Sequence, residues 1–84
     1  MAITAEEIVA RIEAGIPGSK AQATDLGGGN HWRAEVVAAA FEGKSLVERH
    51  QMIYALFRDK MLPRDESIHA LSLKTQTPAE AGQA

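Results

Sequence analysis

The sequence predicts a single α+β domain whose elements run helix, strand, strand, short helix, long helix, strand. Two observations predict this order: apolar residues recur at helical spacing in two stretches, and they alternate with polar residues in three others. The helical stretches cover residues 4–15 and 46–61, and the alternating stretches cover 19–26, 31–38 and 68–74. A chain of 84 residues, 45% of them hydrophobic, can form one small core, so we treat residues 1–84 as one domain.

Signals for the first helix stand at both of its ends. Thr4 and Glu7 have the spacing of a capping box, and Ile3 and Ile8 have that of a hydrophobic staple. Gly15 stands where glycine commonly ends a helix. Together these signals predict a helix that begins after Thr4 and ends at Gly15.

The next two stretches predict a β-hairpin. Between them lie residues 27–30 (Gly-Gly-Gly-Asn), a turn that can take positive φ at several positions. Alternation in the second strand places four side chains on one face: Trp32, Ala34, Val36 and Ala38. The first strand carries alanines on its apolar side, which is typical of a weak edge strand.

The long helix is predicted from a second capping box, formed by Ser45 and Glu48, which follows a short helical turn at residues 38–43. Pro63 stops the helix, and a polar connection covers residues 63–66. One broad apolar face is expected on it, made of Leu46, Val47, His50, Ile53, Tyr54, Phe57 and Met61.

The end of the chain is expected to be less ordered than the rest. After the third strand, Thr77 and Glu80 could start a last helical turn, and the residues that follow are expected to fray. The ordered core is therefore predicted to cover about residues 4–78, followed by a frayed tail.

Composition excludes several classes of function. Nine basic against eleven acidic residues give a net charge of −2, which argues against nucleic-acid binding by charge alone. The absence of cysteine excludes a disulfide framework, a thiolate zinc site and an iron–sulfur cluster held by the chain's own sulfurs. No apolar run reaches the roughly 20 residues that span a bilayer. Acids near the N-terminus are unlike a signal peptide, so a cytoplasmic protein without membrane contact is expected.

Two motif fragments have simpler structural explanations. Gly43-Lys44-Ser45 resembles the end of a phosphate-binding loop, but Ala38 stands where that motif needs its first glycine, so helix capping explains the fragment better. Residues 39–61 resemble a helix-turn-helix in outline. Their cations (Lys44, Arg49, Arg58, Lys60) are nearly cancelled by acids (Glu42, Glu48, Asp59), which favours an amphipathic helix lying on a sheet.

The three histidines are the chain's softest metal ligands. His50 lies on the predicted apolar stripe, which favours a packed side chain with a satisfied hydrogen bond. His31 adjoins the glycine turn and should lie near the surface, and His69 is the second residue of the third predicted strand. No two of them have the close spacing of a metal site within one element, so from the residues alone each is more often an ordinary polar side chain.

The residues at 41–50, FEGKSLVERH, followed by Met52-Ile53-Tyr54, resemble the signature of the BolA-like family. Residues 68–71 (IHAL) and 74–78 (KTQTP) match that family's closing strand and tail. With the first helix and the hairpin, the resemblance covers about residues 4–80. It implies a fold similar to the class II KH domain, a three-stranded sheet covered by helices in the order α-β-β-α-α-β, and hence a single BolA-like domain.

The resemblance also implies a function. It implies a non-enzymatic adaptor that pairs with a monothiol glutaredoxin and shares a [2Fe–2S] cluster with it, together with glutathione, in iron–sulfur cluster trafficking and iron homeostasis. The family's closing-strand histidine is a cluster ligand, and His69 matches it. A second ligand comes from the loop between the first two strands, where His31 is the candidate in this chain. Further partner or secondary-site candidates are His50, Lys44, Arg49 and Lys74.

The implied chemistry agrees with the cysteine-free composition. An iron–sulfur cluster can take two imidazoles on one iron when two thiolates hold the other. This chain could supply only the nitrogens, so the thiolates would come from a partner. The KH fold is known for a GxxG loop that clamps nucleic acid, and the corresponding residues 43–46 (GKSL) lack the second glycine. A nucleic-acid-binding regulator is the alternative, and a homodimer of the free chain and a metal-free interaction module stay open.

Overall fold

The computed structural model describes residues 3–60 and 68–82, and its elements follow the predicted order. The predicted short helix is the 3₁₀ turn η1, and the long helix continues into a second such turn, η2. The elements are α1 (Ala5–Gly15), β1 (Lys20–Gly27), β2 (His31–Val37), η1 (Ala39–Phe41), α2 (Leu46–Tyr54), η2 (Ala55–Phe57) and β3 (Ala70–Gln76). The α+β prediction is confirmed.

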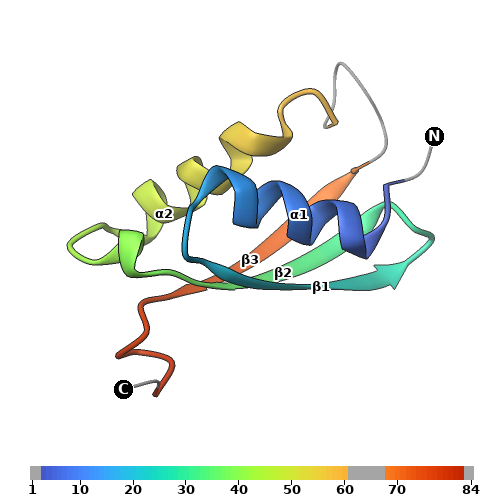
Figure 1. Cartoon of the computed structure of the whole chain (residues 1–84). Coiled ribbons are helices and arrows are strands. Elements are labelled where there is room, and N and C mark those ends of the chain that lie inside the picture. The colour runs from blue at the N-terminus through green and yellow to red at the C-terminus, as the bar shows by residue number, and fades with distance from the viewer. Residues whose placement is uncertain (1–2, 61–67, 83–84) are drawn as a thin grey trace.

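The three strands form one mixed sheet in the order β1-β2-β3, and Figure 1 shows α1 and α2 on the same side of it. β1 and β2 pair antiparallel as the predicted hairpin, whereas β2 and β3 run parallel. A parallel pair needs a long crossover, and the segment that carries α2 supplies it. The parallel register pairs His31 with Ala70, so the residues just before β3 lie beside the first residue of β2.

The core lies between the sheet and the two helices. Its central side chains come from alternate positions of β2, as the alternation predicts, and from one face of each helix. The buried apolar residues are Ile3, Ile8, Ile12, Ile16, Trp32, Ala34, Val36, Ala38, Phe41, Ile53, Phe57, Ile68 and Leu71. Within residues 3–60 and 68–82, no helix is long and apolar enough to span a bilayer.

The interactions at the ends of α1 agree only in part with those predicted. The Thr4 hydroxyl accepts from the Glu7 backbone N–H at 3.1 Å, and Ile3 and Ile8 are both buried, as expected. The Glu7 carboxylate, however, lies 3.4 Å from Arg11 Nε instead of closing the capping box. Gly15 is the last helical residue and has no positive φ; a Cβ there would lie 2.5 Å from the Leu56 side chain. Close packing, not a left-handed cap, is what Gly15 provides.

The predicted apolar face of α2 is rotated relative to the observed one. Ser45 and Glu48 form the complete capping box, but Leu46 and Val47 are 62% and 65% exposed. The buried face runs through Arg49 and then through Ile53 and Phe57, one helical turn apart each time. Because Arg49 is a polar residue type, hydrophobic periodicity leaves it out of the apolar stripe. The predicted stripe is therefore displaced from the buried face by about one residue. Met61 and the predicted stop at Pro63 lie outside the described residues.

Arg49 tolerates burial because four of its five guanidinium N–H groups find partners. Its Nε donates to the Lys44 carbonyl at 3.0 Å, and its NH1 donates to the Thr75 carbonyl at 3.4 Å. The Glu80 carboxylate accepts from NH1 and NH2 at 2.8 and 3.4 Å. The Phe41 ring lies beneath, 5.8 Å from Arg49 Cζ. A paired charge with an apolar stem can thus occupy a core-facing position.

The residues after β3 form a turn that reaches Gly82, and Glu80 in this turn contacts Arg49 of α2. β3 extends to Gln76, and Thr77 and Glu80 then form a reciprocal pair: the Thr77 N–H donates to the Glu80 carboxylate at 2.9 Å, and the Glu80 N–H donates to the Thr77 hydroxyl at 3.1 Å. The Ala81 N–H donates to the Thr77 carbonyl at 3.0 Å. The predicted last helical turn therefore becomes an ordered turn held by Arg49.

The Arg49–Glu80 pair predicts an acid-dependent loss of stability. Hydrogen bonds from Arg49, and then from the Thr77 backbone, hold the pKa of Glu80 below its ordinary value. A carboxyl whose pKa is lower in the folded state stabilises the fold above its unfolded pKa, about 4.3, and this stabilisation is lost as the pH falls further. Glu80→Gln should therefore lower the urea midpoint at pH 7, and the difference from the native chain should shrink below pH 4. Glu42→Gln, at an exposed residue, is the control; equal effects of both variants at pH 7 would contradict the pair's role.

Candidate functional site

The hairpin turn before His31 is ordered by hydrogen bonds from both strands. All three glycines have positive φ, between 75° and 132°. The Asp25 carboxylate accepts from the backbone N–H groups of Gly27 and Gly29 at 2.8 and 3.2 Å. The Trp32 indole donates to the Gly29 carbonyl at 3.1 Å. The turn is thereby held in one conformation where β2 begins.

Asn30 joins His31 to His69. Its side-chain oxygen lies 2.8 Å from His31 Nδ1, and its backbone carbonyl accepts from the N–H groups of His69 and Ala70 at 2.7 and 3.3 Å. The two imidazole rings are exposed, with centroids 5.7 Å apart and planes inclined by 56°. Residues far apart in the sequence thus present two rings side by side at one edge of the domain.

This geometry suits two nitrogen ligands on one metal. An amide oxygen accepts, so the contact with Asn30 favours the His31 tautomer with its proton on Nδ1, which has its lone pair on Nε2. With metal–nitrogen bonds of about 2 Å, two rings on one tetrahedral metal have centres about 5 Å apart, close to the observed 5.7 Å. Over the described ranges, no group of three or more potential metal ligands forms. Alone, the pair offers two of the four ligands that a tetrahedral metal takes.

His50 is not part of this pair. It is half-buried on α2, and its ring meets the Tyr54 ring edge-on with centroids 6.4 Å apart. The Tyr54 hydroxyl in turn donates to the Leu71 carbonyl at 2.9 Å and ties α2 to β3. His50 thus lies beside a contact that joins the helix to the sheet, and its side chain forms no hydrogen bond with the described residues, unlike the packed histidine that was expected.

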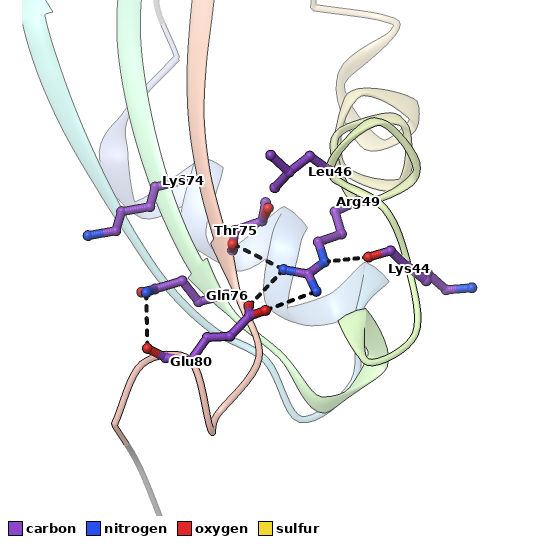
Figure 2. A pocket seen from close by; sticks show the side chains of 7 residues that line it. All are labelled: Lys44, Leu46, Arg49, Lys74, Thr75, Gln76 and Glu80. Atoms are coloured by element: carbon purple, nitrogen blue, oxygen red, sulfur yellow. Dashed lines mark hydrogen bonds and ion pairs between the residues drawn. The ribbon is translucent and has the colours of Figure 1, made fainter.

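Lys44, Arg49 and Lys74 do come together, at the other end of β3. They line an open pocket of about 500 Å³ with Leu46, Thr75 and Glu80 (Figure 2). Lys74 follows His69 by five residues, which corresponds to about 16 Å along a strand. Apart from His50, the side chains predicted from the sequence therefore form two separate groups, the histidine pair and what we call the basic pocket.

The helix-turn-helix outline is not formed. Its expected first helix is the three-residue 3₁₀ turn η1, which is too short to support a second helix on DNA. Of the expected cations, Arg49 is buried against Glu80, so its charge is already neutralised within the fold. The domain therefore has less unpaired positive charge for binding nucleic acid than the count of cations in the sequence suggests.

Comparisons with known proteins agree with this fold. The family model described as BolA-like protein matches residues 15–80. The chain belongs to the BolA-like family. Protein BOLA2 of Arabidopsis thaliana is 36% identical over 81 residues, which cover 93% of this chain and 83% of that protein.

Solved structures of BolA proteins resemble the chain along almost its whole length. A BolA protein homologue from Coxiella burnetii superposes with a TM-score of 0.78 at 36% identity, covering 96% of this chain and 99% of that one. Yeast Fra2 superposes with a TM-score of 0.72 at 31% identity, covering 96% and 86%.

Some relatives are much longer than this BolA-like chain. SufE-like protein 1 of Arabidopsis thaliana is 45% identical over 53 residues, which cover 63% of this chain but 14% of that protein. Protein BOLA1 of the same plant is matched over 43% of its length. The BolA fold thus also occurs as one part of larger chains.

Several residues of the site were not identified from the sequence. Asn30 lies in the predicted turn and Asp25 in the predicted first strand, and neither was identified as part of the site. Asp25 holds the turn and Asn30 contacts both histidines; the Asp-x-Gly spacing before a glycine run was the available signal for Asp25. Glu80 shares the Thr-x-x-Glu spacing of a capping box, which indicated its local turn but not its bond to Arg49.

Removing the Asp25 carboxylate should loosen the turn that carries His31. In Asp25→Ala, the Gly27 and Gly29 amides lose their acceptor, so their hydrogen exchange should accelerate about tenfold, as expected for roughly 1.4 kcal/mol. The nuclear Overhauser effect between the His31 and His69 rings should weaken as well. Gln22→Ala, an exposed change in the same strand, should alter neither signal. Unchanged glycine exchange in Asp25→Ala would show that the carboxylate does not hold the turn.

Proposed function

We propose that this BolA-like protein is a non-enzymatic adaptor that binds a monothiol glutaredoxin and shares a [2Fe–2S] cluster with it, in iron–sulfur cluster trafficking and iron homeostasis. The observation that supports the proposal is the pair of exposed imidazoles, His31 and His69, whose ring centroids lie 5.7 Å apart. In this proposal both are ligands to the same iron.

The metal ligands that this chain can offer favour a site shared with a partner over a site formed by one chain alone. Two imidazoles leave a metal with open positions, and the sequence contains no cysteine to fill them. A partner with thiolates, such as a glutaredoxin with its bound glutathione, would complete the coordination. Imidazole ligation of one iron raises the potential of such a cluster above that of an all-thiolate one.

The chain's own residues give the pair a fixed geometry before any partner binds. The Asn30 side chain orients the His31 ring, and the Asn30 carbonyl fixes the backbone of His69. Such outer hydrogen bonds set which nitrogen is available and limit ring rotation. The pair is also exposed, so a partner can reach it without unfolding the domain.

The proposal is tested by mixing the protein with a cluster-loaded monothiol glutaredoxin and recording visible absorption and circular dichroism. The native chain should change both spectra, because replacing two ligands alters the charge-transfer bands. His69→Ala and His31→Ala should each abolish most of the change. His50→Ala is the matched control and should retain it, since His50 contacts Tyr54 instead of the pair.

An identical spectral change for native protein and His69→Ala would overturn the ligand assignment. Salt separates this function from nucleic-acid binding: a coordinated cluster should persist at high ionic strength, whereas phosphate contacts weaken steeply with salt. Formation of a colourless complex without iron would favour a metal-free interaction module.

A further inference from the structure

The basic pocket at the far end of β3 is separate from the histidine pair. Its walls come from the start of α2, the end of β3 and the turn after β3 (Figure 2). Arg49 and Glu80 lie at its centre, and Lys44 and Lys74 lie on either side with their ammonium groups directed outward. About 16 Å of strand separates the two sites, so their ligands would bind at different places on the domain.

The pocket carries an excess of positive charge in a chain that is negative overall. Three cations line it against one carboxylate, that of Glu80, whereas the whole sequence has a net charge of −2. Of the five guanidinium N–H groups of Arg49, four donate to Lys44, Thr75 and Glu80. One N–H on NH2 is left, beside a pocket whose volume is about 500 Å³.

Two further features of the lining favour a peptide. The Thr75 hydroxyl is buried and has no hydrogen-bond partner among the residues described, so the floor contains an unsatisfied polar group. Leu46 lines the pocket and is 62% exposed, and its neighbour Val47 is 65% exposed. Apolar side chains exposed beside a charged pocket are typical of a protein-binding surface.

We propose that the basic pocket binds a short acidic segment of a second protein, distinct from the partner at the histidine pair. A carboxylate of that segment accepts from the remaining Arg49 N–H and is attracted by the charges of Lys44 and Lys74 at the rim of the pocket, while an apolar neighbour packs on Leu46 and Val47. A carboxylate is already the natural ligand of this guanidinium, as Glu80 shows. The proposal does not depend on the cluster-sharing function.

Nucleic acid fits the pocket less well. Single-stranded nucleic acids are held by aromatic side chains on which bases stack, and the nearby Phe41 is fully buried. An acidic peptide carries fewer negative charges per length than a nucleic acid, and its apolar side chains can pack on the exposed Leu46, whereas a phosphate cannot.

The test uses fluorescence anisotropy with a labelled peptide in which glutamate alternates with leucine, and with its glutamine counterpart. The native chain should bind the acidic peptide and not the glutamine one. Lys44→Glu and Lys74→Glu should each weaken binding by about tenfold or more, since each reverses a charge beside the carboxylate. Arg58→Glu changes the net charge equally at an exposed residue outside the pocket and should have a much smaller effect.

Other outcomes would overturn the proposal. Equal weakening by Arg58→Glu would indicate attraction by net charge only, and no binding by the native chain would exclude the site. Binding of a single-stranded oligonucleotide that depends on Lys44 and Lys74, without peptide binding, would assign the pocket to nucleic acid. His69→Ala should leave peptide affinity unchanged, so failure of the cluster proposal and failure of this one are distinguishable.

Discussion

The parallel pairing of β2 with β3 is the constraint on which the rest of the structure depends. The carbonyl of Asn30 accepts from His69 and Ala70 and so fixes where β3 begins against β2. A slip of one residue would turn Leu71 and Thr75 out of the core and would move His69 away from His31. The same register that buries one face of β3 therefore brings the two imidazoles together, and stability and site geometry are not independent.

A buried arginine fixes the other end of β3. Arg49 takes a core-facing position on α2 and binds the end of β3 through Thr75 and the tail through Glu80. Arg11 of α1 makes similar contacts with η2 and the residues after it. It donates to the Leu56 carbonyl and to the Asp59 carboxylate, and its Cζ lies 5.8 Å from the centre of the Phe57 ring. In a domain with so small a core, such arginines join elements that apolar contacts alone would hold weakly.

Most structural features that depend on neighbouring residues were predicted correctly, whereas features that depend on contacts between distant residues were not. The hairpin glycines, the Ser45–Glu48 box and the alternation of β2 each act within a few residues, and each appears as predicted. The face of α2 was misplaced because Arg49 becomes a core residue only when Glu80, far along the chain, pairs with it. His31 lies beside His69 because of the β2–β3 register, which the residues of neither strand specify alone. Periodicity therefore could not predict this pair, and its prediction came from the family resemblance.

The incompleteness of the histidine pair is itself informative. A resident metal site is normally closed by three or four ligands of one chain, with further hydrogen bonds around it. In the part of the chain that the structure describes, hydrogen bonds of Asn30 and Asp25 order the turn and the pair, although only two potential ligands come together. The proposed shared site would use this arrangement, because two ordered imidazoles favour one coordination geometry, whereas a metal bound to them alone would keep open positions for ligands of a partner.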